Sequence, residues 1–360
     1  MIGGYKMLDN LKEKNMGVVR TVLGPVSTQD LGIVLINESL LSVYPGAELA
    51  PEINMDKSEI FDTLKRKLNK FRQQGGKTIV DASGMFHGRD VWLYQSLSKA
   101  TGIHIIATTG LGPEKLLGGY FVTPQTNPPT PWPAEKFAGL FTKEVVEGVV
   151  VPRVERATAA GLVVSIASAE GITNEEKSLF RGSAITARDT GVAVSVQHGA
   201  DAVADLDLLL AEGVATNRVI IGSIDRIGAV ASKAAIEIAS RGAYVAFDHI
   251  GWGSEDGYVS DIERVKLVVE LLEEGLGERV LLSTSAVGVA KGHEAKDLAY
   301  DYLLSTFVPL LRKAGVTEKQ IHTLLEENPQ RVLTVDGSAE LEIKEFSPIA
   351  WKELFASVDH

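Results

Sequence analysis

Short apolar runs alternate with stretches of helical spacing along most of the chain. The runs are rich in Val, Ile and Leu and lack polar alternation, which is typical of strands buried on both faces of a parallel sheet. Eight runs are predicted as strands, at 33–37, 77–83, 104–110, 161–168, 192–199, 218–225, 243–250 and 279–286. Helices are predicted between and after them at 58–74, 89–101, 134–148, 174–189, 201–213, 228–241, 259–275 and 298–314.

Eight successive β-then-α units predict a (β/α)8 TIM barrel, an α/β fold. A doubly wound open sheet is the alternative, but the absence of a second compositional block favours a closed sheet. The segment RTVLGPVS precedes the first strand and predicts a short N-terminal hairpin or cap. We expect a single barrel domain over 1–335 and a tail over 336–360 that packs on the barrel or at an interface. The long Gly/Pro-rich loop 110–133 is expected to overhang the mouth.

Composition narrows the class of protein. The 360 residues include 36 Lys+Arg and 47 Asp+Glu, for a net charge of −11, and 45% of residues are hydrophobic. These values are typical of soluble globular proteins, and the acidic excess argues against nucleic-acid or anionic-membrane partners. The absence of cysteine excludes disulfides, thiolate metal sites and a Cys nucleophile. No secretory signal, membrane span, dinucleotide fingerprint or P-loop is recognised, which predicts a cytoplasmic protein without a cofactor.

The predicted strands end in polar residues, and the active site of a barrel lies at those carboxyl ends. Each Ser or Thr taken alone is most simply a cap of the following helix. Their convergence from eight strands nevertheless indicates a ligand site. The polar strand ends are Asn37, Ser39, Asp81, Ser83, Thr108, Thr109, Ser165, Gln197, His198, Ser223, Asp225, Asp248, His249, Thr284 and Ser285.

Several of these strings, in this order and spacing, resemble the phosphotriesterase family of the amidohydrolase superfamily. They include RTVLGPVSTQDLGIVLINESLL, TGIHIIATTG, RVIIGSID, VAFDHIGWG and ENPQRVL, and the resemblance covers about residues 18–335. It implies a (β/α)8 barrel that hydrolyses organophosphates, lactones or related esters and amides. It also implies two divalent metals, held by a His-x-His on strand 1, a carbamylated Lys on strand 4, one His each on strands 5 and 6, and an Asp on strand 8.

None of these six ligands is present where the resemblance places it. The positions hold Asn37, Ser39, Val164, Gln197, Ser223 and Ser285. Amide and hydroxyl oxygens are weak ligands for such metals, and a valine offers no donor atom. We therefore predict that no metal binds there. A shift of the alignment by one residue would place His198 at a ligand position. A new metal site built from His87, His198, His249 and His293 with Asp225 or Asp248 is the alternative.

The resemblance also matches His249 to a strand 7 histidine that relays a proton in the family. Without metals, catalysis near neutral pH needs such a titrating group. We expect His249 to be the general base or acid, with Asp225 as the orienting carboxylate and Asp248 as a neighbour. The side chains expected to bind the substrate are Asn37, Ser39, Gln197, His198, Ser223, Ser285 and Trp252.

Three functions are compatible with these residues. The first is a metal-independent enzyme, hydrolase or lyase in type, acting on a small polar ester, lactone or related molecule. The second is a non-catalytic small-molecule-binding protein that kept the barrel. The third is a metal-dependent hydrolase with rebuilt ligands. A homodimer is expected in each case, because the resemblance implies pairing and the apolar stretch VTPQTNPPTPWP needs cover.

Overall fold

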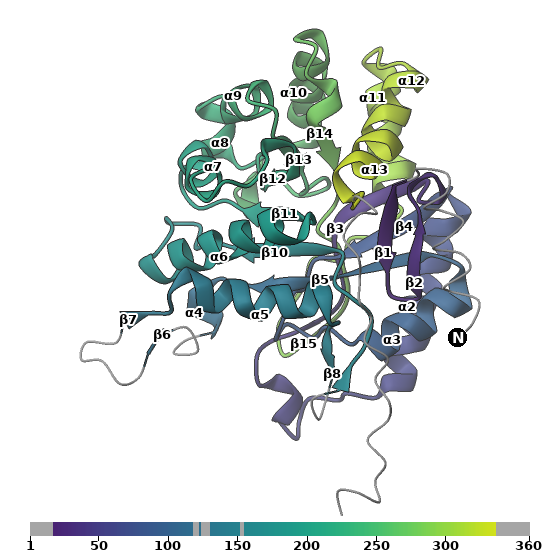
Figure 1. The fold of residues 1–360 in the computed structure, drawn as a ribbon. Coiled ribbons are helices and arrows are strands. Elements are labelled where there is room, and N and C mark those ends of the chain that lie inside the picture. Colours follow the sequence, from purple (N-terminus) through teal and green to yellow (C-terminus); the bar gives the residue numbers. More distant parts are fainter. Residues whose placement is uncertain (1–16, 118–121, 124–129, 152–154, 336–360) are drawn as a thin grey trace, which may run out of the picture.

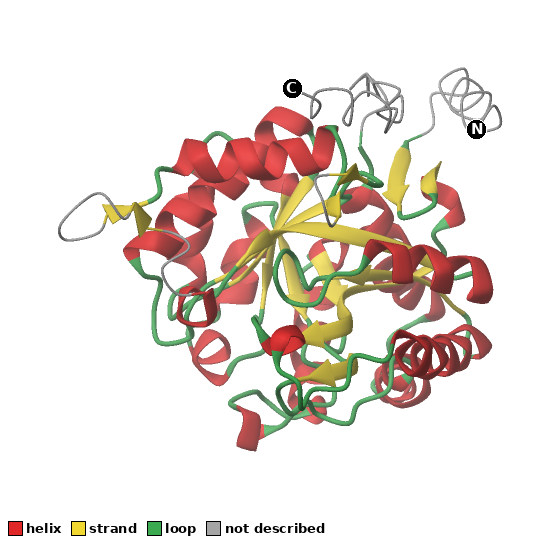
Figure 2. Ribbon diagram, turned by 90° about the horizontal axis from the view of Figure 1, so that it is seen from below, coloured by secondary structure: helices red, strands yellow, loops and turns green. Residues whose placement is uncertain are grey.

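A computed structural model describes residues 17–117, 122–123, 130–151 and 155–335. Its main sheet is parallel throughout and runs in the order β14-β13-β12-β11-β10-β5-β4-β3-β15. The sheet curls into a barrel whose helices lie outside (Figures 1 and 2), which confirms the predicted fold. Its strands are β3 (Ile33–Val43), β4 (Gly76–Asp81), β5 (His104–Leu111), β10 (Leu162–Ile166), β11 (Ala193–Gln197), β12 (Val219–Gly222), β13 (Tyr244–Phe247), β14 (Val280–Leu282) and β15 (Val287–Lys291).

The eighth strand differs from the prediction of one continuous run. Only β14 lies within the predicted run 279–286, residues 283–286 form a bend, and β15 follows beyond the run and closes the barrel by pairing with β3. The backbone N–H of Asn37 donates to Oγ of Ser283 over 3.0 Å, and the N–H of Ser285 donates to the carbonyl of Asn37 over 3.2 Å. Beyond the bend, the N–H of Ser39 donates to the carbonyl of Ala286 over 3.0 Å. Side-chain and irregular backbone hydrogen bonds thus replace a regular ladder at this seam.

The outer helices begin at side-chain caps, which explains where they start. Asp56 accepts the N–H groups of Ser58 and Glu59, and Thr173 and Ser260 each form a capping box. The longer helices are α2 (Lys57–Gln73), α3 (Val91–Thr101), α5 (Ala134–Val146), α6 (Asn174–Thr190), α7 (Ala202–Leu210) and α10 (Asp261–Glu273). The shorter ones are α4 (Glu114–Leu117), α8 (Ile227–Ala231), α9 (Ala234–Ser240), α11 (Val308–Lys313), α12 (Glu318–His322) and α13 (Asn328–Leu333).

Two predicted helices are wrong in their continuity. The helix predicted at 228–241 is interrupted between α8 and α9, where Lys233 takes a left-handed φ of 56°. The helix predicted at 298–314 begins only at Leu303, with a π-type turn over Leu303–Phe307 before α11. Residues 118–121 and 124–129 of the loop predicted over the mouth lie outside the described residues. Its described parts include the short pair β6 (Val122–Thr123) and β7 (Thr130–Pro131), and a similar pair follows in β8 (Val150–Val151) and β9 (Glu155–Arg156).

The N-terminal hairpin is confirmed and lies at the amino-terminal end of the barrel. It consists of β1 (Val18–Thr21) and β2 (Gly24–Ser27), and the N–H of Val22 donates to the carbonyl of Ile105 at the start of β5. Val18 also pairs with Val335, so the entry and exit of the described chain meet here. The predicted tail 336–360 lies outside the described residues.

Two apolar layers hold the barrel together. Side chains inside it, among them Val34, Ile106, Val164 and Ile220, form one buried cluster. A larger cluster fills the space between the strands and the helices. Alternation along each strand divides the side chains between these layers. In the described part of the chain, no helix is long and apolar enough to cross a membrane.

Candidate functional site

Asp248 is the centre of a hydrogen-bond network at the carboxyl ends of the strands. It follows β13 and is 1% exposed. Each carboxylate oxygen accepts two donors. The four donors are Nδ2 of Asn37 at 3.2 Å, Nε2 of Gln197 at 2.7 Å, the N–H of Ser223 at 2.8 Å and Nδ1 of His249 at 2.9 Å. The strands β3 and β11 and the residues that follow β12 and β13 are therefore tied to a single buried carboxylate.

The other polar groups of this network satisfy one another. Oγ of Ser223 donates to Oε1 of Gln197. Oγ of Ser285 accepts from Nδ2 of Asn37 over 2.9 Å and donates to the carbonyl of Asp248 over 2.7 Å. The structure thus brings together four of the seven residues predicted to bind substrate. Their polar groups form hydrogen bonds with one another and with Asp248.

Ser223 and Ser285 share an unusual backbone conformation. Their φ angles are 56° and 49°, in the left-handed region that side chains other than glycine rarely adopt. Such conformations persist where the surrounding structure enforces them, and they cluster at functional sites. Here the enforcing contacts are the bond from the N–H of Ser223 to Asp248 and that from the N–H of Ser285 to Asn37.

His249 lies at the edge of the network, where two carboxylates stabilise its protonated form. Its Nδ1 is 2.9 Å from Oδ1 of Asp248 and 3.7 Å from Oδ1 of Asp225. Burial opposes the charge on the ring, but Asp248 and Asp225 outweigh it and raise the pKa of His249 to about 9. The ring stacks on Tyr258, with centroids 3.9 Å apart, and meets the edge of Trp252. Among the described residues, Nε2 of His249 has no hydrogen-bond partner.

Asp225 was predicted to orient His249, but Asp248 is the closer carboxylate. Asp225 instead pairs with Arg264 of α10, whose Nε lies 2.7 Å from Oδ2, and both side chains are fully buried. Burial alone would raise the pKa of Asp225, yet His249 and Arg264 hold it below its usual value. Oδ1 of Asp225 accepts no hydrogen bond and faces His249 across that longer gap. Asp225 therefore acts on the ring of His249 through its charge, and its Oδ2 also accepts the backbone N–H of His249 over 3.2 Å.

Sequence reasoning missed Arg264 because it considered only residues at the strand ends, whereas Arg264 lies on the outer helix α10. Its spacing carried a signal, since Arg264, Val268 and Leu271 lie on one buried face of α10. The guanidinium also donates to Oδ1 of Asp261 over 2.7 Å and to the carbonyl of Trp252 over 2.8 Å. Arg264 thereby anchors α10 to the loop that carries the aromatic neighbours of His249.

The remaining predicted binding residues have protein partners. Nδ1 of His198 faces the carbonyl of Gly199 at 2.6 Å, its Nε2 faces the carbonyl of Ser223 at 2.9 Å, and burial lowers its pKa. Nε1 of Trp252 donates to the carbonyl of Thr284 over 2.8 Å. Oγ of Ser39 and Oγ of Ser83 are 2.8 Å apart. Of these residues, Ser39 and Trp252 are half-buried.

A rebuilt metal site finds little support in this geometry. Nε2 of His87 is 2.9 Å from the carbonyl of Gly112, and His293 is exposed. Among the described residues, the one group of three metal-type ligands within 4.8 Å of one another is Asp225, Asp248 and His249. Arg264 already neutralises Asp225 and four donors occupy Asp248, so a cation there would compete with the guanidinium and with these donors.

The two metals implied by the resemblance do not fit these residues either. Val164 is 3% exposed within the apolar interior of the barrel and offers no donor. The amide and hydroxyl groups of Asn37, Gln197, Ser223 and Ser285 bond one another or Asp248, and the hydroxyl of Ser39 lies against that of Ser83. These five positions supply no converging imidazoles or carboxylates. The donor set is therefore that of a hydrogen-bonded network rather than a binuclear centre.

A second buried carboxylate, Glu38, was not predicted as functional. It is 2% exposed and accepts the hydroxyl of Ser283 over 2.8 Å, the N–H of Thr284 over 2.9 Å and the N–H of Ala286 over 2.5 Å. Burial raises its pKa to about 7 despite these bonds. Glu38 clamps the bend between β14 and β15, which carries Ser285.

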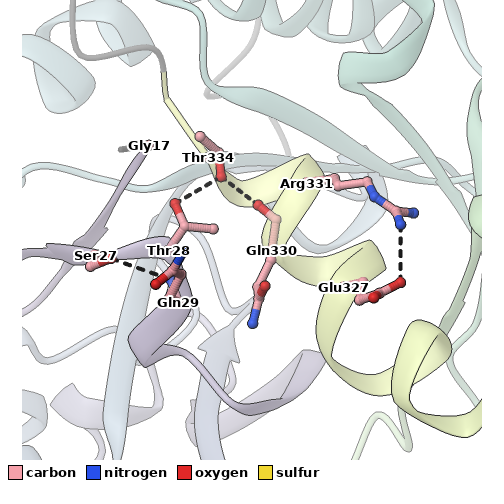
Figure 3. Close-up of a pocket in the computed structure, with 8 residues that line it drawn as sticks. All are labelled: Gly17, Ser27, Thr28, Gln29, Glu327, Gln330, Arg331 and Thr334. Atoms are coloured by element: carbon pink, nitrogen blue, oxygen red, sulfur yellow. Dashed lines mark hydrogen bonds and ion pairs between the residues drawn. The ribbon is translucent and has the colours of Figure 1, made fainter. Parts of the chain in front are cut away.

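The structure also contains a cavity away from these residues. It measures about 440 Å³ and lies at the amino-terminal end of the barrel, between the hairpin and α13 (Figure 3). The hydroxyls of Thr28 and Thr334 lie 3.0 Å apart at its edge. Active sites of (β/α)8 barrels form at the other end, so we assign this cavity no part in the candidate site.

A parallel barrel with ionisable side chains gathered at the carboxyl ends of its strands has the architecture of a barrel enzyme. The chain belongs to the phosphotriesterase family, which it matches over residues 17–333. It is 26% identical to the phosphotriesterase homology protein of Escherichia coli K12 over 85% of this chain and 99% of that protein. It is also 26% identical to the aryldialkylphosphatase of Saccharolobus solfataricus over 85% and 96% of the respective chains.

Structural likeness agrees with this assignment. Organophosphorus hydrolase from Deinococcus radiodurans superposes with a TM-score of 0.79 at 25% identity, covering 89% of this chain and 97% of that one. N-acetyltaurine hydrolase of Dictyostelium discoideum is 27% identical over 75% of this chain and 72% of that protein. Family membership and these hydrolase relatives support a hydrolase-type enzyme.

Proposed function

We propose that this protein is a hydrolase-type enzyme that works without the two metals of its family, on a small polar ester, lactone or related molecule. The observation that carries the proposal is the state of His249. Two buried carboxylates, Asp248 and Asp225, stabilise its imidazolium form, and its Nε2 has no hydrogen-bond partner among the described residues. A charged N–H donor stabilises negative charge on an oxygen of the substrate, as a metal ion does in a metal-dependent hydrolase.

The charge on His249 favours one of the two roles left open by the sequence, that of a general acid. With a pKa of about 9, the ring carries its proton at neutral pH and acts as an acid rather than a base. In hydrolysis, water attacks the acyl or phosphoryl centre and the bond to the leaving oxygen breaks. Nε2 of His249 protonates that oxygen, and the ring recovers a proton from the attacking water. Asp248 and Asp225 stabilise the cation before and after this exchange.

A second function, the binding of a small molecule without turnover, is favoured by a different observation. The amide and hydroxyl groups around Asp248 are bonded to one another, and no residue of the network is placed as a base for water. Such a closed network gives a rigid floor to a ligand site, but it contributes little to a reaction that needs both an acid and a base.

Turnover of panels of lactones, carboxylic esters and phosphotriesters would test the proposal. Each panel is run with a chelator, with no addition and with zinc, cobalt or manganese. We expect activity that the chelator leaves unchanged and that His249→Gln lowers by about 100-fold or more. The control is His322→Gln at an exposed site. Activity that appears only with metal contradicts the proposal, and folded protein without turnover on any panel favours the binding function.

A further inference from the structure

Arg226 is a cation without a matching carboxylate at the carboxyl ends of the strands. It lies four residues after β12, is half-buried, and donates from Nη1 to the carbonyl of His198 over 2.6 Å. Within the part of the chain that the structure describes, no carboxylate lies within 4.0 Å of its guanidinium. The charge of Arg226 lowers the pKa of Asp205, but burial outweighs this effect and raises that pKa to about 6. Oδ2 of Asp205 accepts the N–H of Gly199.

Tyr258 connects Arg226 to His249. Arg226 and Tyr258 form a backbone bridge, and the imidazole of His249 stacks on the ring of Tyr258. Burial raises the pKa of Tyr258, and the adjacent guanidinium of Arg226 opposes that rise. The two cations therefore lie beside one aromatic ring, His249 against its face and Arg226 near its hydroxyl.

Each of the other cations around this ring has a carboxylate partner. Arg264 pairs with Asp225 and Asp261, and His249 with Asp248. Lys296, which lies over the ring of Trp252, pairs with Asp256 at 2.5 Å. Of these four cations, Arg226 is the one without a carboxylate within 4.0 Å among the described residues. A half-buried guanidinium that is bonded to carbonyl groups alone has lost hydration without gaining an opposite charge, and an anionic ligand supplies that charge.

We infer that the ligand of this site carries an oxyanion, a carboxylate, sulfonate or phosphate group, which binds to the guanidinium of Arg226, while Nε2 of His249 stays free for the oxygen of the bond that is broken. Arginine presents a planar set of donors that fits two oxygens of such a group. This inference deepens the proposed function, because it names a charged group on the molecule that the same site binds.

The experiment follows the imidazole resonances of His249 by NMR during titration with small probes. The anions are propionate, propanesulfonate and methylphosphonate, and the neutral counterpart of propionate is propionamide. We expect at least one anion to shift the His249 signal saturably, whereas propionamide does not. Arg226→Gln should weaken that anion at least tenfold. The control is Arg241→Gln, which removes a cation at an exposed pair with Asp207.

Each outcome bears on the inference separately from the proposed function. Anion binding that depends on Arg226 supports the inference even if no substrate is ever turned over. Equal binding of propionamide and propionate, or no saturable binding by any anion, overturns it. So does unchanged affinity in a folded Arg226→Gln variant. Efficient turnover of neutral esters by that variant would support the proposed function and reject the oxyanion.

Discussion

Asp248 and His249 are neighbours in the chain, and their side chains also meet, with Oδ1 of Asp248 2.9 Å from Nδ1 of His249. Successive side chains of a strand point to opposite faces, so this contact requires the chain to leave the strand first. β13 ends at Phe247, one residue earlier. The end of the strand thus creates the ion pair on which the charge of His249 depends.

The first prediction concerns the titration of His249. We expect its NMR resonances to titrate near pH 9, and Asp225→Asn to lower the midpoint by about 1 unit or more, because an opposite charge close to the ring is removed. Asp189→Asn, at an exposed position paired with Arg188, is the control and should leave the midpoint unchanged. A wild-type midpoint below pH 7 would contradict the role of His249 as an acid.

The same shift has a consequence for stability. The pKa of His249 is higher in the folded state than its usual value of 6.5, so the folded state holds the proton more tightly. This stabilisation is fully present below about pH 6.5 and is lost as the pH rises through 9. We expect the free energy of unfolding, measured in urea between pH 6.5 and 9, to fall less with rising pH in His249→Gln than in the wild type. The same pH dependence in both proteins would show that His249 does not contribute to it.

Metal content provides the next prediction. Protein purified without added metal should contain well below one equivalent of zinc, cobalt or manganese by emission spectrometry, because the available donors are amides, hydroxyls and occupied carboxylates. A chelator should leave the melting temperature unchanged. A family member that keeps all six ligands, purified in parallel, controls for loss during preparation. Two equivalents of metal in this protein would show that the donor set has been misjudged.

Much of the fold was predictable because its strands are buried on both faces. Continuous apolar runs such as the one around Val194 leave few alternatives to a parallel strand. The division of the eighth strand was not predictable. The residues 283–286 are compatible with a strand, and the bend is set by the buried carboxylate of Glu38, which is distant in sequence.

The candidate site shows a similar limit. Position along the strands predicted that Asn37, Gln197 and Ser223 lie together, and the structure places them around Asp248. Their use could not be predicted, because amides and hydroxyls donate and accept in several directions. Whether they bond a ligand or one another depends on distances of a few tenths of an ångström. Arg226 was missed because a single arginine after a strand has no distinctive pattern.

Glu38 gives a prediction whose sign depends on pH. Its pKa of about 7 lies above the usual 4.5, so its contribution to stability is full below about pH 4.5 and is lost as the pH rises through 7. Glu38→Gln removes this titration and leaves an amide donor facing the N–H groups of Thr284 and Ala286. The variant should therefore be destabilised more near pH 5 than near pH 8, by a difference of about 2–3 kcal/mol.

Urea unfolding of both proteins at the two pH values measures this difference. Glu294→Gln, at an exposed position, is the matched control and should change stability by less than about 0.5 kcal/mol at either pH. An equal loss at both pH values in Glu38→Gln would mean that Glu38 is already ionised near pH 5 and that the bend tolerates its charge.

The last prediction concerns Gly222→Ala, which introduces a methyl group into the hydrogen-bond network around Asp248. A methyl group at this last residue of β12 would lie 2.5 Å from Nε2 of Gln197 and 2.6 Å from Oδ2 of Asp248. Both atoms must move, so Gly222→Ala should lose about 1–3 kcal/mol of stability and shift the His249 resonances. Gly228→Ala, where nothing lies within 4 Å, is the control and should be neutral or stabilising by up to about 1 kcal/mol.

A double variant tests whether Gln197 and Gly222 are coupled. Gln197→Ala removes the side chain that the new methyl group of Gly222→Ala would meet. The double variant should therefore lose less stability than the sum of the losses in the two single variants. Strict additivity would mean that Gln197 does not support Asp248, and the network would then be no more than a set of independent pairs.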